Sequence, residues 1–317
     1  IAIGYNALQG VTTGGDNIGI GGAAGYNITT GTRNIGIGNG VFGSSGTAFT
    51  GTHNIGLGSW TTGDALTSGG YNILMGHYAG SGLTTGSNNI AIGQNALGAN
   101  TTADDNIAIG KQALTATTTG YGNTSIGRYS MMANTTGYFN SALGYNSLIA
   151  NTTGNSNVAL GMYALSANTT GIRNIGIGYN AVGSNTTAMG NVGIGHTALA
   201  ANTTGASNTG IGMSALTANT TGTRNTSVGA NSLDSNTTGN YNTAVGKDAL
   251  QSSTTADSNT AVGDWALALT TTGASNTGLG KSSLQQNTTG SNNTAVGYYS
   301  LLYNTTGSSN TGIGMGA

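Results

Sequence analysis

Apolar residues recur along this chain at fixed positions of a unit that is 17 residues long. Counting the leading Asn of each unit as position 0, position 1 is usually β-branched, position 3 is aliphatic and position 4 is Gly. The unit at 293–309, NTAVGYYSLLYNTTGSS, shows this pattern clearly. Because alternate residues of a strand point to opposite faces, the pattern predicts a short β-strand whose positions 1 and 3 face the interior.

A second apolar run follows at positions 7 and 8, usually Ala or Ser and then Leu, and many units then carry Asn-Thr-Thr-Gly. Strand, glycine corner, second strand and turn within 17 residues predict one coil of a parallel β-solenoid. The Gly of the turn is replaced by Ala103, Ala188 and Ala256, so we expect a less demanding corner there than at position 4. Stacked coils also predict a ladder of hydrogen-bonded amides along the leading Asn residues.

The repeat extends over the whole chain. We interpret residues 1–317 as a single continuous all-β array, a parallel β-solenoid (β-roll) of about 18 coils with a 17-residue period. Two loop insertions, in 39–51 and 59–69, lengthen two units without shifting the register. The sequence starts and ends within a unit, so we expect a segment of a longer or processed chain.

Small residues occupy position 2, which on a strand lies opposite positions 1 and 3. We therefore expect position 2 to face outward and to form an inter-chain packing stripe, because an exposed strand position usually carries a larger polar side chain. This stripe includes Ala91, Ala159, Gly210, Ala261 and Ala295. The few large apolar side chains in each coil form a thin core, which also favours several chains side by side. We expect a homotrimer.

Charge and composition exclude several classes of protein. The chain has 7 Lys and Arg residues and 8 Asp and Glu residues, so it lacks the excess of positive charge expected of a nucleic-acid-binding protein. Without cysteine, neither disulfides nor thiolate metal sites are possible, which suits an extracellular repeat protein. The chain contains no run of 18 apolar residues, the length that would predict insertion into a membrane. The 58 glycines do not recur at every third residue and the chain has no proline, which excludes a collagen-like protein.

Candidate chemistry is sparse, and we predict no catalytic, metal or cofactor-binding residues and no cofactor. Asp104 and Asp105 are the one pair of adjacent acidic residues. A polysaccharide-cleaving fibre is a less favoured alternative, because it needs two carboxylates held in position for the reaction. Aromatic residues gather at positions 5 and 6, where exposed rings suit stacking on a sugar or a protein surface. The predicted surface ligand contacts are Tyr145, Tyr163, Tyr179, Trp265, Tyr298 and Tyr299.

The Asn-Thr-Thr triplets permit two further interpretations. They match the N-glycosylation acceptor sequence, although turn chemistry explains their recurrence. Stacked Thr residues at positions 12 and 13 present a regular row of hydroxyl groups, so an ice-binding solenoid is a less favoured alternative.

The pentad Asn-Thr-Ala-Val-Gly, at 242–246, 259–263 and 293–297, resembles the head repeats of YadA-like trimeric autotransporter adhesins. Those repeats carry a similar Asn-Ser/Thr-x-Ala-Ile/Val-Gly signature. The chain also resembles the shaft repeats of phage tail fibres. The resemblance extends over the whole chain and implies a trimeric, left-handed parallel β-roll, although the longer period and the Asn-Thr-Thr-Gly loop depart from the adhesin pattern.

These observations predict a non-enzymatic structural and adhesive fibre segment. We expect an extracellular rod, on a cell-surface appendage or a virion fibre, that serves surface attachment or receptor display. A host-surface glycan or protein is a candidate partner. The alternative is a self-assembling extracellular filament formed by end-to-end stacking of solenoids, because exposed strand edges pair readily.

Overall fold

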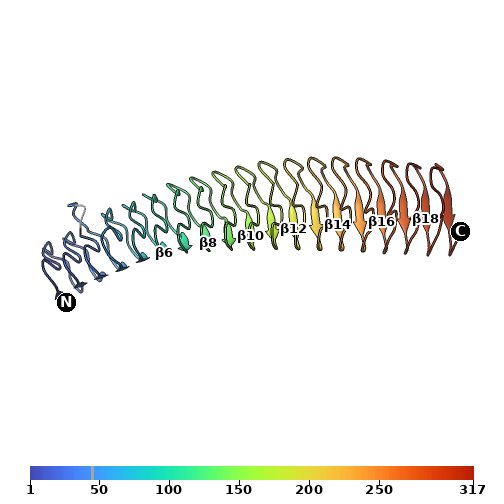
Figure 1. Cartoon of the computed structure of the whole chain (residues 1–317). Helices are drawn as coiled ribbons and strands as arrows, with labels where there is room; N and C mark the ends of the chain where they lie inside the picture. Colours follow the sequence, from blue (N-terminus) through green and yellow to red (C-terminus); the bar gives the residue numbers. More distant parts are fainter. Residues whose placement is uncertain (44–45) are drawn as a thin grey trace. The chain divides into compact units, whose positions relative to one another are not determined.

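The structure, a computed structural model, describes residues 1–43 and 46–317 as two compact units, Ile1–Asn157 and Val158–Ala317. Residues 44 and 45, within the predicted insertion at 39–51, lie outside the described residues. Both units are parallel β-solenoids with the 17-residue period, and the repeat forms about 18 coils in all. Figure 1 shows one short strand in each labelled coil. The described residues contain no helix.

Each strand has two or three residues, and within each unit it pairs in parallel with the next strand along the chain. The register is uniform, so that Ile90 of β6 lies opposite Ile107 of β7, and Ala91 opposite Ala108. The first unit contains β1 (Ala2–Ile3), β2 (Ile18–Ile20), β3 (Ile35–Ile37), β4 (Ile55–Leu57), β5 (Ile73–Met75), β6 (Ile90–Ile92), β7 (Ile107–Ile109), β8 (Thr124–Ile126) and β9 (Ser141–Leu143). The second contains β10 (Val158–Leu160), β11 (Ile175–Ile177), β12 (Val192–Ile194), β13 (Thr209–Ile211), β14 (Thr226–Val228), β15 (Thr243–Val245), β16 (Thr260–Val262), β17 (Thr277–Leu279), β18 (Thr294–Val296) and β19 (Thr311–Ile313).

The predicted second strand is wrong, since the segment that follows the glycine corner consists of turns. Positions 6 and 8 repeatedly adopt a left-handed backbone, as at Gln112 (φ 56°) and Leu114 (φ 50°). Two left-handed residues separated by one residue prevent an extended strand. The segment is still held to its neighbour by backbone hydrogen bonds, because Leu97 N donates to Ala113 O at 3.0 Å.

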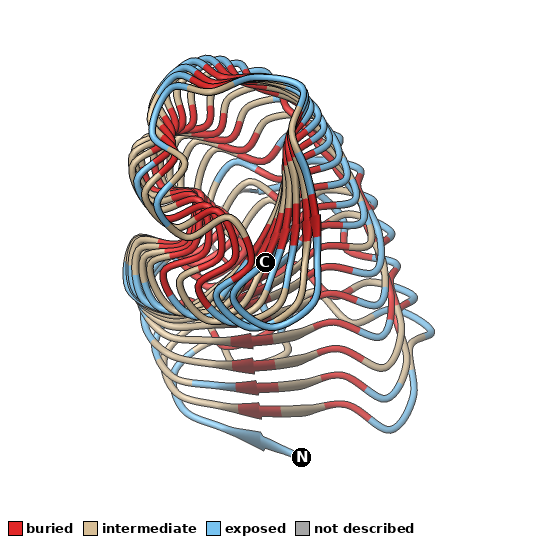
Figure 2. Cartoon of the chain, turned by 90° about the vertical axis from the view of Figure 1, so that its right-hand side faces the viewer, coloured by how far each residue is buried: buried red, intermediate tan, exposed pale blue. Residues whose placement is uncertain are grey.

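The predicted orientation of the strands is also wrong. In the complete strands, position 2 faces the interior, whereas positions 1 and 3 face outward and stay half-buried or exposed. Figure 2 shows that buried residues recur at the same places in successive coils, including within the strands. The residues of the expected inter-chain packing stripe are therefore core residues: Ala91, Ala159, Gly210, Ala261 and Ala295 are all buried. Their side chains cannot contact a second chain.

Small residues occupy position 2 because a large side chain from the preceding coil fills the space in front of it. A Cβ added at Gly210 would lie 3.3 Å from Leu199 Cγ, and one added at Gly278 would lie 3.3 Å from Leu267 Cγ. Leu74, the exception at position 2, lies where position 8 holds glycine. A Cβ added at Gly80 would lie 2.7 Å from Leu74 Cδ2. The core therefore keeps its volume by exchanging a large residue between two positions.

The predicted ladder of leading Asn residues is confirmed. Asn225 is fully buried, and its side chain donates to Gly239 O at 2.8 Å and to Asn208 Oδ1 at 3.1 Å. Its own Oδ1 accepts from the backbone N of Asn242 at 2.9 Å. Each amide thus joins three consecutive coils, which satisfies polar groups that the thin core would otherwise bury without partners.

A second ladder, which the sequence analysis did not predict, runs through the Asn of the Asn-Thr-Thr-Gly turn. Asn219 Nδ2 donates to Asn202 Oδ1 at 2.8 Å, and Asn236 Nδ2 donates to Asn219 Oδ1 at 2.8 Å. These three side chains are fully buried. Glycosylation at these Asn residues is therefore incompatible with the folded coil, although the triplet matches the acceptor sequence.

The second ladder is interrupted at Ser253, and this site provides a stability test. The buried Oδ1 of Asn236 and Oγ of Ser253 have no hydrogen-bond partner. We expect Ser253→Asn to stabilise the chain by about 1 kcal/mol, because the new amide reaches Asn236 Oδ1 as its counterparts do. Urea unfolding measures the difference. Ser252→Asn, on the neighbouring half-buried residue, is the control and should have no such effect; equal stability of the native chain and Ser253→Asn would contradict the ladder model.

Candidate functional site

The outer sheet face consists of the side chains at positions 1 and 3 of β2–β19. In-register pairing places like residues above one another, as in the columns Ile73–Ile90–Ile107 and Met75–Ile92–Ile109. Many of these side chains are half-buried, and others are more exposed, for example Leu143 at 45% and Leu160 at 41%. In each unit the face therefore carries a column of apolar side chains that the coil interior does not cover.

The two units differ in the chemistry of the outer sheet face. Position 1 is Ile throughout β2–β7, whereas it is Thr in every strand from β13 to β19. Position 3 stays aliphatic in both units. No strand carries a charged residue at either position. Such a surface suits contact with another apolar face rather than catalysis or metal binding.

Aromatic side chains collect at the first corner, defined as positions 5 and 6 of the coils. In the first unit, the rings of Tyr129 and Tyr145 lie 6.2 Å apart. In the second, Tyr163 lies 6.2 Å from Tyr179, which stacks on His196 at 5.1 Å. The structure thus brings together Tyr163 and Tyr179 from the predicted ligand contacts.

The other predicted ligand contacts form separate groups. Tyr298 and Tyr299 pack against each other with ring centroids 3.9 Å apart, and their hydrogen bond raises the pKa of Tyr298. Lys247 Nζ lies 5.7 Å from the ring centroid of Trp265 and forms an ion pair with Asp248 at 2.8 Å. Since Asp248 is buried, this pair fixes the lysine beside the indole ring.

Electrostatic effects at the first corner come from a few cations. Arg128 donates a hydrogen bond to Tyr129 Oη at 2.9 Å, which lowers the pKa of Tyr129, and the charge of Lys111 acts in the same direction. In the second unit, the hydrogen bond to Asp248 raises the pKa of Lys247. At position 9, outside this corner, burial raises the pKa of Asp234, and the charge of Asp248 adds to that increase.

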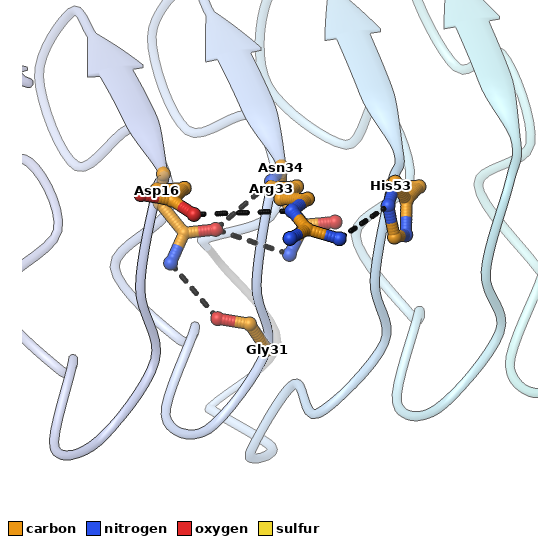
Figure 3. Close-up of polar contacts among 6 residues, drawn as sticks. Asp16, Gly31, Arg33, Asn34 and His53 are labelled. Atoms are coloured by element: carbon orange, nitrogen blue, oxygen red, sulfur yellow. Dashed lines mark hydrogen bonds and ion pairs between the residues drawn. The ribbon is translucent and has the colours of Figure 1, made fainter.

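The second corner, positions 15 and 16, carries a row of stacked polar and aromatic groups. Figure 3 shows Arg33 between Asp16 and His53. Arg33 lies 3.8 Å from Asp16 Oδ2 and 3.4 Å from His53 Nε2, and the ring of His53 stacks on Tyr71 at 4.7 Å. The ion pair is largely exposed and contributes little to stability. This row links four successive coils along their surface.

A cluster of three aromatic rings lies further along the second corner. Tyr121 and Tyr138 stack at 5.3 Å with an interplanar angle of 3°, and Phe139 meets both rings edge-on. The ligand contacts predicted from the sequence lie at positions 5 and 6 and not at this corner. The available signal was the recurrence of aromatic residues at position 15 of two consecutive units.

The residues behind the polysaccharide-cleaving and ice-binding alternatives form hydrogen bonds between neighbouring coils. Asp104 Oδ1 accepts a hydrogen bond from Ser87 N at 2.7 Å, and therefore joins neighbouring turns. Thr hydroxyls at position 12 donate to the next coil, as Thr203 Oγ1 does to Thr220 O at 3.1 Å. Within residues 1–43 and 46–317, no three His, Cys, Asp or Glu side chains gather as a metal site. No helix of the described chain is long and apolar enough to cross a membrane.

Comparison with known proteins assigns no relative to this chain. No protein-family model matches it, and no curated protein shows significant similarity to it. The function of this chain is therefore inferred from its own surfaces.

Proposed function

We propose that this chain is a non-enzymatic structural and adhesive fibre segment that associates side by side as an extracellular homotrimer. The outer sheet face is the observation that carries the proposal. A continuous column of aliphatic side chains, free of charge, runs along each unit and is left uncovered by the coil that bears it. Burial against other copies of the same face would remove this apolar surface from water.

The outer sheet face of each unit is large enough to form a substantial part of an interface. A strand of three residues offers roughly 10 Å by 4.8 Å of surface, so the complete strands of each unit offer about 400–500 Å². Each unit therefore supplies about half of the roughly 800 Å² that a specific protein interface buries on each partner. Because the face is uncharged, identical copies do not repel one another there, and the repeated spacing of the side chains lets two copies interdigitate along their length.

Resemblance to the YadA-like head repeats supports three chains rather than two, and it supports an extracellular setting on a cell-surface appendage or a virion fibre. In this arrangement the outer sheet face holds the fibre together, while corner residues remain candidates for contact with a host-surface glycan or protein. This differs from the association expected from the sequence, because the packing residues are those at positions 1 and 3 and not the alanines at position 2.

Charge placed on the outer sheet face tests the proposal. We expect Ile92→Glu combined with Ile126→Glu to convert a trimer into folded monomers, because both side chains project outward from the coil and a buried carboxylate would have no partner in the interface. Sedimentation velocity measures the oligomeric state, and circular dichroism checks the fold. The control is Thr102→Glu, on an exposed turn residue, which should remain trimeric. A native chain that sediments as a monomer, or a trimeric double variant, would refute the association.

A further inference from the structure

A hollow of about 360 Å³ lies on the first corner of the first unit, lined by Tyr78, Gln94, Asn95, Lys111 and Gln112. Its volume is within the range of about 300–1,000 Å³ that small-molecule sites occupy. None of its lining residues belongs to the predicted ligand contacts, the outer sheet face or either Asn ladder. The hollow is thus a separate feature of the surface.

Backbone pairing between coils sets the geometry of the hollow. Asn95 N donates to His77 O at 2.9 Å, and Gln112 N donates to Gln94 O at 2.9 Å. Three consecutive coils therefore supply the lining at a spacing of roughly 4.8 Å. Tyr78, Asn95 and Gln112 share a left-handed backbone, with φ between 56° and 60°. The His77 ring packs edge-on against Tyr78 at 4.1 Å and supports that ring.

The lining combines one aromatic ring with three carboxamides and one ammonium group. Carboxamides both donate and accept hydrogen bonds, which matches the hydroxyl groups of a sugar. The half-exposed ring of Tyr78 provides an apolar surface on which a pyranose can stack. No aliphatic side chain lines the hollow, so a purely apolar ligand would find few partners.

Positive charge distinguishes this part of the first corner. Lys111 forms no ion pair in the described part of the chain, and Arg128 follows at the same position of the next coil. No Asp or Glu occupies position 5 or 6 in residues 1–157. The corresponding lysines of the second unit differ, because Lys247 pairs with Asp248 and Lys281 lies 3.7 Å from Asp264. The ammonium group of Lys111 is therefore available to an anion.

We propose that this hollow binds an acidic sugar, a pyranose that carries a carboxylate. The ring stacks on Tyr78, the hydroxyl groups bond to the side chains of Gln94, Asn95 and Gln112, and the carboxylate pairs with Lys111. The inference rests on the attachment role proposed above and specifies its ligand as an anionic glycan. It does not require a particular number of chains, because all five lining residues belong to one chain.

Two ligands that differ only at the carboxylate provide the test. Saturation-transfer NMR on the full chain would compare methyl glucuronoside with methyl glucoside. We expect the glucuronoside to bind at least tenfold more tightly, and its affinity to fall when salt is raised from 0.15 M to 0.5 M. Lys111→Gln should weaken glucuronoside binding about tenfold and leave the glucoside unchanged, while Tyr78→Asn should weaken both.

Each variant introduces a residue that the neighbouring coil already carries at the same position, and is therefore expected to fold. Gln94 occupies the position of Lys111, and Asn95 occupies the position of Tyr78. Lys281→Gln, which removes a paired lysine from the second unit, is the matched control and should bind like the native chain. Absent glucuronoside binding, equal affinity for both sugars, or an unchanged Lys111→Gln variant would overturn the inference. Sedimentation of the same samples reports the trimer independently, so that failure of one proposal is distinguishable from failure of the other.

Discussion

Gly229→Ala should destabilise the second unit by about 3 kcal/mol or more, because this substitution meets two obstacles at once. Gly229 has φ +137°, a conformation that L side chains rarely adopt. An added Cβ would also lie 2.5 Å from Gly246 O and 2.6 Å from Gly246 C. Neither atom can move away without lengthening the backbone pairing between adjacent coils. Urea unfolding followed by circular dichroism measures the loss.

A matched control is Gly222→Ala, at the glycine of the preceding turn. Its backbone is outside the left-handed region, and the equivalent residue two coils earlier is Ala188. An added Cβ meets Asn219 Oδ1 and Gly239 O, each at 2.4 Å, and the natural Ala188, which follows Asn185 at the same spacing, shows that a coil adjusts to these contacts. We expect a loss of less than about 1 kcal/mol. Equal losses for the two variants would show that the conformation at position 4 is not the determinant.

The same contrast explains why the sequence predicted these corners correctly. Gly at position 4 never varies and has a large positive φ in almost every coil, with Gly58 as the exception. The glycine of the turn varies to alanine because its φ does not require glycine. The period, the parallel stacking and the Asn ladder were predictable for a similar reason, since each depends on a local geometry that tolerates only one residue type.

The orientation of the strands was not predictable from alternation alone. That rule assigns the larger apolar residues to the core, but here Leu at position 8 reaches the core from a segment of turns. The sequence did contain a clue. Leu74 is large at position 2 in the unit where Gly80 replaces the usual Leu at position 8, and this exchange of volume indicates that the two positions share one interior.

The candidate sites were less predictable than the fold. The aromatic residues of the first corner follow from the repeat, because a residue type that recurs at one position forms a row on stacked coils. The hollow beside Lys111 depends instead on which residues follow one another in three particular coils. The sequence alone does not indicate that its carboxamide side chains share a site, because only the stacking of the coils places them around one ring.

Asn225→Leu should produce the largest loss of stability, about 4 kcal/mol or more. The substitution removes the donor to Gly239 O and the acceptor for Asn242 N, at 2.8 Å and 2.9 Å, in a site that water does not reach. Gly239 O of the same coil and the backbone N of Asn242 in the next coil lose these partners, and leucine supplies none. Because stability in a solenoid depends on contacts between neighbours, the damage extends to the coils on both sides.

Asn225→Asp separates the two functions of the amide. The carboxylate keeps an acceptor for Asn242 N, but it cannot donate to Gly239 O or Asn208 Oδ1 and places its charge beside both oxygens. We therefore expect this variant to lose stability too, and to recover part of it at low pH, where the protonated acid can donate one hydrogen bond. Asn155→Leu, at a half-buried position of a turn, controls for the apolar substitution and should change stability by less than about 0.5 kcal/mol. A similar small change for Asn225→Leu would mean that water or backbone movement replaces the ladder, and that the amides are not what holds successive coils together.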